Sequence, residues 1–457
     1  EGKPAPDHAT IARFRSLHFA PCAKVILTQC TQLLYELGEI SGKNIFIDGT
    51  KIEANANKYT FVWKRAVTKQ QEKLGQKAAA LVQECVEMYD LKPVWRGRVK
   101  IKTLKKLRKQ LYVIKEQENI PFVSGIGKRK STLQKQIEKL TYFLEKAKEY
   151  NQKIYRCGKR NSYSKTDPDA TFMRMKEDAM RNGQTKPGYN LQTGTENQFI
   201  IDFRLFPNPT DTLTLIPFFH SFRHRYNRLP AIGVADSGYG SEENYRFMQE
   251  NGIKAFVKYN FFHKEQRPRY TPNPFHAESL HYNAEEDYYV CPMGQHMNRI
   301  GTRRDKTASG YITESVRYEA QRCEGCPLRG CCFKARGNRI IEVNHRLNQY
   351  KRQARERLTS EEGGKHRKRR CIEPEAVFGQ MKYDMAYRRF RHVGKEKVTM
   401  DFAFFAIAFN IKKMCAKMAK EGYKLFLDLI CRLYKHLRTT YWMNCKTFEL
   451  TVRENAA

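Results

Sequence analysis

The sequence predicts an α/β protein in which a mixed sheet is flanked by helices and interrupted by two insertions. Residues 232–259 give the first indication, because strand, loop, helix and strand follow in succession, as in a right-handed parallel crossover. Residues 44–49 give the second, since three large apolar residues precede Asp48, as in a buried strand. The third is that amphipathic helices in residues 63–159 separate this strand from further strand-rich sequence.

The expected core begins near the start of the chain. Residues 1–43 predict short helices, with Asp7 as the cap of the first and Gly38 at the end of the second. Residues 44–62 and 160–259 supply the strands of the core and the helices between them.

The remaining residues predict two insertions and a helical C-terminal part. Residues 63–159 predict an antiparallel pair of helices around a basic middle. Residues 260–348 combine Pro, Tyr and clustered Cys, so we expect an insertion of irregular chain. Residues 349–420 predict helices, of which the last is apolar on nearly all sides and therefore buried. Residues 421–457 predict a helix and a frayed tail.

The composition is strongly basic, because 84 Lys and Arg oppose 48 Asp and Glu for a formal net charge of +36. Such an excess repels itself unless a polyanion neutralises it, so nucleic acid is the first expected partner and an anionic membrane surface the second. No apolar run reaches the about 18 residues of a membrane-spanning helix. The 13 Cys are odd in number and mostly scattered, which argues for a reducing intracellular compartment.

Two predicted strands end on a carboxylate, Asp48 after "IFI" and Asp236 after "IGVA". An unpaired buried carboxylate is costly, and a shared divalent cation would remove that cost. Magnesium prefers oxygen ligands, and two such ions about 4 Å apart activate a nucleophile and stabilise the leaving oxygen of a phosphodiester. We expect Glu375 as the third ligand, because Pro374 can start a helix there and Lys382 would share its face. The alternative is that Glu375 and Lys382 are surface residues.

Several blocks carry a resemblance to a known family: "IFIDGTKIEANANKYTFVWKR", "TDPDATFMRMKEDAMRNGQTKPGYNLQ", "VADSGYGSEENY" and "RCIEPEAVFGQMK". In order and over nearly the whole chain, they resemble bacterial insertion-sequence transposases of the DDE class, in the subgroup with DGTKIEAN and DPDA blocks. The resemblance implies a ribonuclease H-like fold. It also implies a triad of Asp48, Asp236 and Glu375 that binds two magnesium ions, for which manganese substitutes.

The same resemblance implies partners and further site residues. Lys382 matches the family's Lys seven residues after the Glu, and Arg370 is the nearest upstream basic residue. Cys371 and Lys368 stand where some relatives have Arg and Tyr. The start "PDHATIARFR" resembles the end of an N-terminal DNA-recognition domain, which implies an N-terminal truncation. The implied partners are double-stranded DNA, at transposon ends and target, and a second copy of the chain, in the nucleoid of a bacterial cytoplasm.

Basic segments flank Glu375 on both sides in sequence. Such residues either contact the DNA backbone or form solvated faces, and their position favours the first reading. The expected contacts are Lys368, Arg369, Arg370, Lys382, Arg388, Arg389 and Arg391. For the helical insertion, a solvated hairpin and a DNA-contacting arm fit equally well.

Other residues offer rival or additional sites. Asp167 and Asp169 around a Pro are an alternative metal pair, although this pattern more often forms a turn. We expect surface roles for Glu53 and Asp202. Four thiols are spaced for a structural zinc site, with His296 as a substitute ligand and reduced thiols as the alternative. The expected zinc ligands are Cys291, Cys323, Cys326 and Cys331.

The sequence thus predicts a transposase that cleaves DNA at the end of an element and joins the freed 3′ hydroxyl to target DNA. Three alternatives remain: a ribonuclease H-like nuclease that cuts without joining, a transposase-derived DNA-binding protein without activity, and a zinc-dependent hydrolase.

Overall fold

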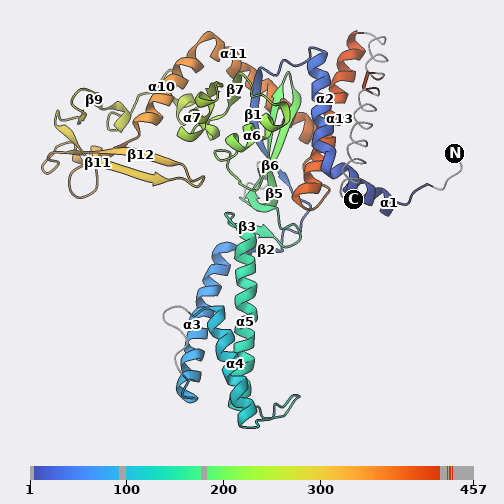
Figure 1. Cartoon of the computed structure of the whole chain (residues 1–457). Coiled ribbons are helices and arrows are strands. Elements are labelled where there is room, and N and C mark those ends of the chain that lie inside the picture. Colours follow the sequence, from blue (N-terminus) through green and yellow to red (C-terminus); the bar gives the residue numbers. More distant parts are fainter. Residues whose placement is uncertain are drawn as a thin grey trace, which may run out of the picture. The chain divides into compact units, whose positions relative to one another are not determined.

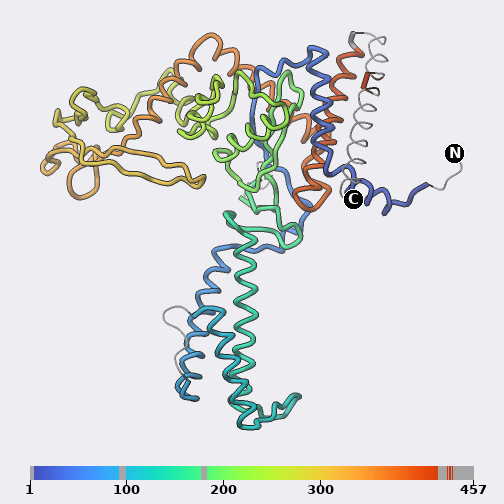
Figure 2. Tube along the Cα trace, viewed as in Figure 1, coloured from blue at the N-terminus to red at the C-terminus, as the bar shows by residue number. Residues whose placement is uncertain are grey.

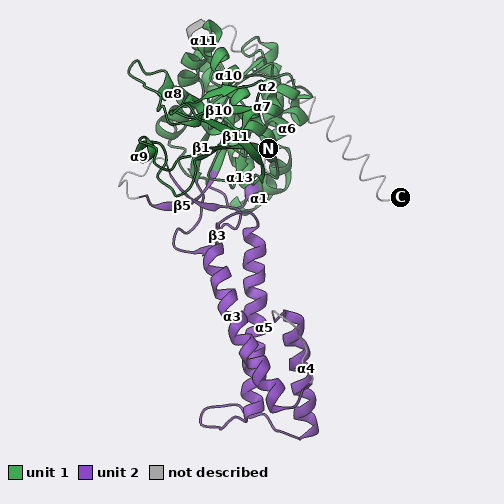
Figure 3. Cartoon of the chain, turned by 90° about the vertical axis from the view of Figure 1, so that its left-hand side faces the viewer, with its two compact units in different colours: residues 1–52, 190–390, 396–457 green, residues 53–189, 391–395 purple. Residues whose placement is uncertain are grey.

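The computed structural model describes residues 5–91, 99–175 and 183–421, together with Ile430, Arg432, Leu433 and Lys435. The chain divides into two compact units, coloured in Figure 3. The first contains residues 1–52, 190–390 and 396–457, and the second contains residues 53–189 and 391–395. The predicted C-terminal helix and tail lie almost entirely outside the described residues. Within them, no helix has the length and apolar character to cross a membrane.

A mixed sheet forms the core of the first unit (Figure 1). Strand β1 (Asn44–Glu53) pairs in parallel with β7 (Ile232–Ala235), and β7 pairs in parallel with β8 (Lys254–Val257). The other neighbour of β1 is β5 (Thr185–Glu196), which is antiparallel to β6 (Phe199–Phe206). Figure 2 shows the blue trace of β1 beside the green trace of β7, far from it in sequence. The mixed α/β prediction is therefore confirmed.

Helices cover this sheet and bury its apolar side chains. They are α2 (Ala20–Glu36), α6 (Leu215–Tyr226), α7 (Glu242–Glu250) and most of α13 (Lys395–Glu421). Helix α1 (His8–Phe14) precedes them and has no buried residue. As predicted, Asp7 caps α1, with the Thr10 amide donating to its carboxylate over 2.7 Å. Phe46, Phe219 and Phe256 are all at most 1% exposed at the centre of the core. This packing holds the carboxyl ends of β1, β7 and β8 in place.

The second unit contains three long helices, not the predicted pair: α3 (Lys64–Met88), α4 (Ile101–Gln117) and α5 (Thr132–Cys157). The expected basic middle is largely α4 itself. Its Leu104, Leu107 and Leu111 form an apolar stripe at helical spacing and pack with α3 and α5 in one cluster. The dense positive charge of this segment concealed the stripe. Short strands complete the unit: β2 (Phe61–Trp63), β3 (Ser162–Ser164) and β4 (Thr171–Arg174), which pairs with the start of β5.

The cysteine-bearing segment is an antiparallel sheet, so the prediction of irregular chain is wrong. Its strands are β9 (His281–Asn283), β10 (Tyr288–Val290), β11 (His296–Lys306), β12 (Ile312–Ala320) and β13 (Ile340–Val343). Strand β11 is mostly exposed and lacks the apolar alternation that marks a strand in sequence, whereas β12 has it near its end, at Val316, Tyr318 and Ala320. Tyr289, Met297 and Tyr318 form the centre of its small core.

A nearly continuous helical stretch follows. It comprises α10 (His345–Thr359), α11 (Glu361–Arg370), a π-helical turn at Cys371–Glu375, α12 (Ala376–Gly379) and a second π-helical turn at Gln380–Asp384. Ser360 caps α11 through the Gly363 amide. A helix start at Pro374 was predicted wrongly, because Pro374 lies inside this helical stretch.

Candidate active site

The parallel pairing of β1 and β7 places two carboxylates side by side. Ile47 and Ala235 are partners in the register, so Asp48 and Asp236 follow as the next residues on neighbouring strands. Asp48 is buried, at 8% exposure. The side chain of Asp236 is 40% exposed and precedes a turn of 3-10 helix at Ser237–Tyr239. Buried β-strands therefore carry both groups to one edge of the sheet.

One arginine contacts all three predicted acidic residues. The Nη2 of Arg370 lies 3.1 Å from Oδ2 of Asp48 and 3.4 Å from Oδ2 of Asp236. Its Nη1 donates to Oε1 of Glu375 over 3.0 Å. Glu375, half-exposed, thereby joins two residues that are remote from it in sequence. The structure brings the three carboxylates together around a single guanidinium.

The π-helical turn explains how Arg370 and Glu375 meet. The two residues are five positions apart. In an α-helix, side chains five positions apart point about 140° away from each other, because each residue turns the helix by about 100°. A π-helix has a wider turn, closed by hydrogen bonds between residues five apart. The turn at Cys371–Glu375 therefore brings both side chains to one face. This turn compensates for a spacing one residue longer than α-helical geometry requires.

The donor set suits a hard divalent cation, since all three groups are carboxylates that now share one positive charge. Asp48 is buried, and its charge needs a counter-charge that Arg370 supplies. In the described part of the chain, no three His, Cys, Asp or Glu side chains already stand in an arrangement that holds one ion. The three carboxylates instead spread around the guanidinium.

The predicted DNA-contacting residues occupy different environments. Lys382 is buried at 4% exposure, and its carbonyl accepts a hydrogen bond from Nε of Arg388. Arg369 donates to Asn197 and to Glu373, the second over 3.1 Å. The side chains of Lys368, Arg388 and Arg389 are exposed, as is that of Arg391, which belongs to the second unit.

Sequence reasoning missed a lysine at the third strand end. Lys258 directly follows β8, and its amide donates to the carbonyl of Ala235 over 3.4 Å. Its Nζ lies 3.9 Å from Oδ1 of Asp236 and 2.9 Å from Nε2 of His263. Burial, and second the positive charge of Arg370, lower the pKa of Lys258. Burial, and second the positive charge of Lys258, lower the pKa of His263. The available signal was a polar residue directly after "KAFV", as Asp236 follows "IGVA".

A polar network on the other side of Asp48 was missed as well. Gln192 and Asn190 both donate to Oδ1 of Asp211, over 2.8 and 2.7 Å. Tyr239 donates to Gln192, and burial, reinforced by the carboxylates of Asp211 and Asp48, raises the pKa of Tyr239 well above its usual range. Gly49 allows this close approach, since a Cβ there would lie 2.1 Å from Nε2 of Gln192. No sequence pattern marked Asp211.

The rival carboxylates have structural partners. Asp167 is fully buried, and the hydroxyl of Tyr189 donates to its carboxylate, 3.0 Å from Oδ1 and 2.9 Å from Oδ2. The amide of Asp169 closes a turn on Asp167, in agreement with the turn reading. Glu53 is half-buried and pairs with Lys186. The surface role predicted for Asp202 is wrong, because Asp202 is fully buried and ion-paired with Arg225.

Two of the cysteine thiols contact the same arginine. Sγ of Cys323 accepts from the amide of Arg339 over 3.3 Å, and Sγ of Cys332 accepts from its Nη1 over 2.9 Å. Cys326 is half-buried and Cys331 exposed, while Cys291 and Cys323 pack against the small core of this sheet. The described residues contain no metal-binding group here, with or without His296. The zinc prediction therefore has no support.

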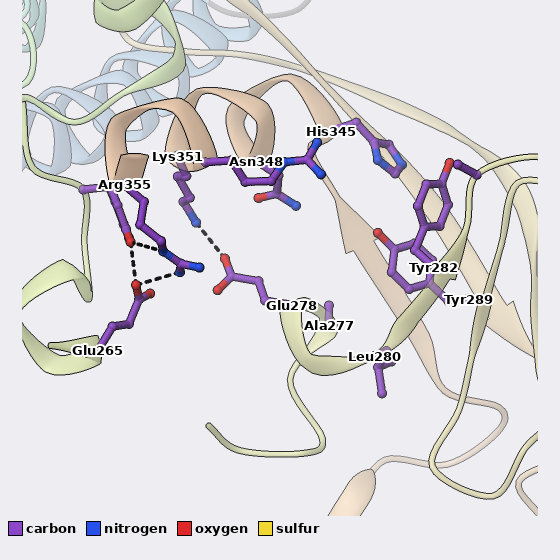
Figure 4. Close-up of a pocket in the computed structure, with 13 residues that line it drawn as sticks. Glu265, Ala277, Glu278, Leu280, Tyr282, Tyr289, His345, Asn348, Lys351 and Arg355 are labelled. Carbon is purple, nitrogen blue, oxygen red and sulfur yellow. Dashed lines mark hydrogen bonds and ion pairs between the residues drawn. The ribbon is translucent and has the colours of Figure 1, made fainter. Parts of the chain in front are cut away.

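A separate cavity of about 380 Å³ lies along one face of α10 (Figure 4). Lys351 and Arg355 project from the helix towards Glu278 and Glu265 and pair with them, both over 2.7 Å. Tyr282 and other aromatic residues form the far side. The two ion pairs neutralise Lys351 and Arg355, whereas Arg352 also lines the cavity and adds a further positive charge.

Residues 290–415 match the family model described as "Transposase DDE domain", which supports a DDE transposase. Such a domain implies enzymatic activity on DNA. The matched residues include Glu375 and Lys382, whereas Asp48 and Asp236 lie before them. No curated protein and no solved structure matches the chain.

Proposed function

We propose that the chain is a DDE transposase of an insertion sequence, with Asp48, Asp236 and Glu375 as its catalytic carboxylates. One observation carries the proposal: three acidic side chains, distant in sequence, converge on the guanidinium of Arg370. Phosphodiester chemistry by two metal ions needs such a cluster of oxygen ligands. The family match supports the same reaction class independently.

The strand order supports a ribonuclease H-like fold for the catalytic part. Strand β6 is antiparallel to β5, and β5 lies beside β1. The sheet then continues from β1 into the parallel strands β7 and β8. Helix α6 connects β6 to β7, and α7 connects β7 to β8, while β1 pairs with β7; Asp48, Asp236 and Lys258 therefore lie on three adjacent parallel strands. Ligands of open α/β sheets bind at the carboxyl ends of their parallel strands.

The carboxylates would hold magnesium, and manganese would substitute. When bound, these ions would activate the attacking water or 3′ hydroxyl and stabilise the leaving 3′ oxygen. Asp48 and Asp236 are held by the sheet, whereas Glu375 is carried by the helical stretch. Arg370 holds the three carboxylates together before ions bind. Once displaced, its guanidinium is available for a DNA phosphate next to the same carboxylates.

The test is a cleavage and strand-transfer assay. The DNA that borders the coding sequence serves as donor, and a supercoiled plasmid as target, with magnesium or manganese. We expect cleavage and joining by the unmodified chain and neither by Asp236→Asn. Asp305→Asn, on the exposed part of β11, is the matched control and should retain activity.

Three other outcomes would replace the proposal. Cleavage without joining of a 3′-hydroxyl donor would indicate a nuclease. DNA binding without any metal-dependent cleavage would indicate a derived DNA-binding protein. Activity that survives Asp236→Asn would place the catalytic centre elsewhere. The proposed assembly is a homodimer on paired DNA ends, which light scattering of the DNA complex would measure.

A further inference from the structure

We propose that Lys258, supported by His263, binds a DNA phosphate next to Asp236. This inference rests on the proposed function and adds a substrate-binding residue to it. Its basis is a row of three functional groups on adjacent parallel strands: Asp48 on β1, Asp236 after β7 and Lys258 after β8. The register places Ala235 opposite Val257, so the last two residues are neighbours.

The ammonium group of Lys258 is placed where a lysine has no packing advantage. The residue is only 7% exposed. Burial of a charge is costly unless partners compensate for it, and an apolar residue of similar length would fill the same space. A buried lysine at this position therefore indicates that its charge is used.

The partners of Lys258 compensate its charge incompletely. Within the described residues, its side-chain polar contacts are the imidazole of His263 and Oδ1 of Asp236, the latter at 3.9 Å. Asp236 is shared, because its other oxygen contacts Arg370. The carboxylate nearest to Lys258 thus also serves a second cation, which leaves the ammonium group available for an additional anion.

A phosphodiester is the anion that the proposed reaction brings to this place. Asp236 is 40% exposed, so a ligand that reaches its carboxylate also comes close to Lys258. Divalent ions at the carboxylates would weaken the pull of Asp236 on the ammonium group. His263 accepts a hydrogen bond from Nζ and so fixes the position of the ammonium without neutralising it. Lys382 lies on a different element, so the two lysines are separate contacts.

The experiment measures the salt dependence of DNA binding by the full chain. The probe is a duplex of the DNA that borders the coding sequence, with calcium as an ion that does not support cleavage. For Lys258→Met we expect the negative slope of the logarithm of the DNA-binding constant against log[salt] to become shallower by about one, because one phosphate contact is lost. With manganese, cleavage should slow by about 10-fold or more, and Lys258→Arg should restore the slope.

Lys254→Met is the matched control. Lys254 begins the same strand, is half-exposed and pairs with Glu362, so its removal should leave both the calcium-dependent slope and the cleavage rate unchanged. A Lys258→Met variant that matches Lys254→Met in both measurements overturns the inference. Thermal melting checks the fold, and Lys258→Gln with the same expectations replaces the methionine variant if that one does not fold.

The two proposals fail in different ways. If Asp236→Asn abolishes cleavage while Lys258→Met has no effect, only the role of Lys258 is lost. If the unmodified chain shows no metal-dependent cleavage, the proposed function is lost, and a calcium-dependent slope change in Lys258→Met would still demonstrate the phosphate contact.

Discussion

The acidic site and the cysteine-bearing sheet, both in the first unit, differ in how their polar residues are brought together. Asp48, Asp236 and Glu375 are distant in sequence yet surround one guanidinium. Cys323 and Cys326 are close in sequence, yet the thiol of Cys323 contacts the amide of Arg339 and that of Cys332 contacts its guanidinium. Adjacent strands of a sheet fix the position of the groups that they carry, as for Asp48 within β1 and Asp236 after β7, whereas spacing along a loop leaves the geometry open. Charges next to apolar strand runs were therefore the better guide to a cluster of side chains.

The largest expected effect separates the two regions directly. Asp48→Asn should lower metal-dependent cleavage at least about 1,000-fold, equivalent to about 4 kcal/mol, because a buried ligand is lost. Cys323→Ser should change the rate less than about 3-fold. Initial rates on the same DNA measure both. A cysteine variant as inactive as Asp48→Asn would reverse the comparison and favour the zinc-dependent alternative.

Removal of the shared cation is the next largest change. Arg370→Gln should destabilise the metal-free protein by about 3 kcal/mol, because the buried carboxylate of Asp48 loses its counter-charge. Magnesium should recover more stability in the variant than in the unmodified chain, since no guanidinium has to leave. Urea unfolding with and without magnesium measures both effects. Equal stabilisation by magnesium in the two proteins would show that Arg370 does not compete with the ion.

Close packing next to the site predicts a smaller effect. In Gly49→Ala, the new Cβ would lie 2.1 Å from Nε2 of Gln192 and 2.7 Å from Asp211, so we expect a loss of about 2 kcal/mol. Gly75→Ala is the control, because nothing lies within 4 Å of its Cβ and helix α3 should gain about 0.5 kcal/mol. Denaturant titration compares the variants. Equal stability of the two would mean that the polar network tolerates displacement.

The smallest effect concerns pH. His366 packs against Phe46 and Phe256, and burial lowers its pKa below the ordinary 6.5, against an opposing influence of Glu362. The unfolded chain therefore binds this proton more readily, so the contribution of His366 is constant above about pH 6.5 and falls as the pH drops below it. In His366→Phe, the part of the loss of stability below about pH 6.5 that is due to this histidine should disappear. Urea midpoints between about pH 7.5 and 5 test it, and an unchanged dependence would contradict the assignment.

Much of the sheet was predictable, because its signals are local. Parallel β7 and β8 around α7 follow from apolar runs, a Ser cap and a Gly stop. The hairpin of β11 and β12 was harder to predict, since β11 is polar and exposed and pairs through its backbone, and only the end of β12 has an apolar alternation. Helix α4 was obscured in the same way by its lysines.

The site was predictable only in part, for a comparable reason. Asp48 and Asp236 were conspicuous as charges at the ends of apolar strands. Lys258 occupies the equivalent position but has the sign of charge that dominates the composition, so it did not stand out. Asp211 is brought in by long-range hydrogen bonds with Asn190 and Gln192, which no local pattern reports.

The widened helical turn at Cys371–Glu375 has a consequence for recognising such proteins from sequence. Arg370 and Glu375 are five positions apart and still meet, because the wider turn brings them to one face. A search that demands the four-residue interval of a regular α-helix between such a pair would miss it. An alignment of such sequences should therefore tolerate a single-residue gap between the basic run and the last acidic residue.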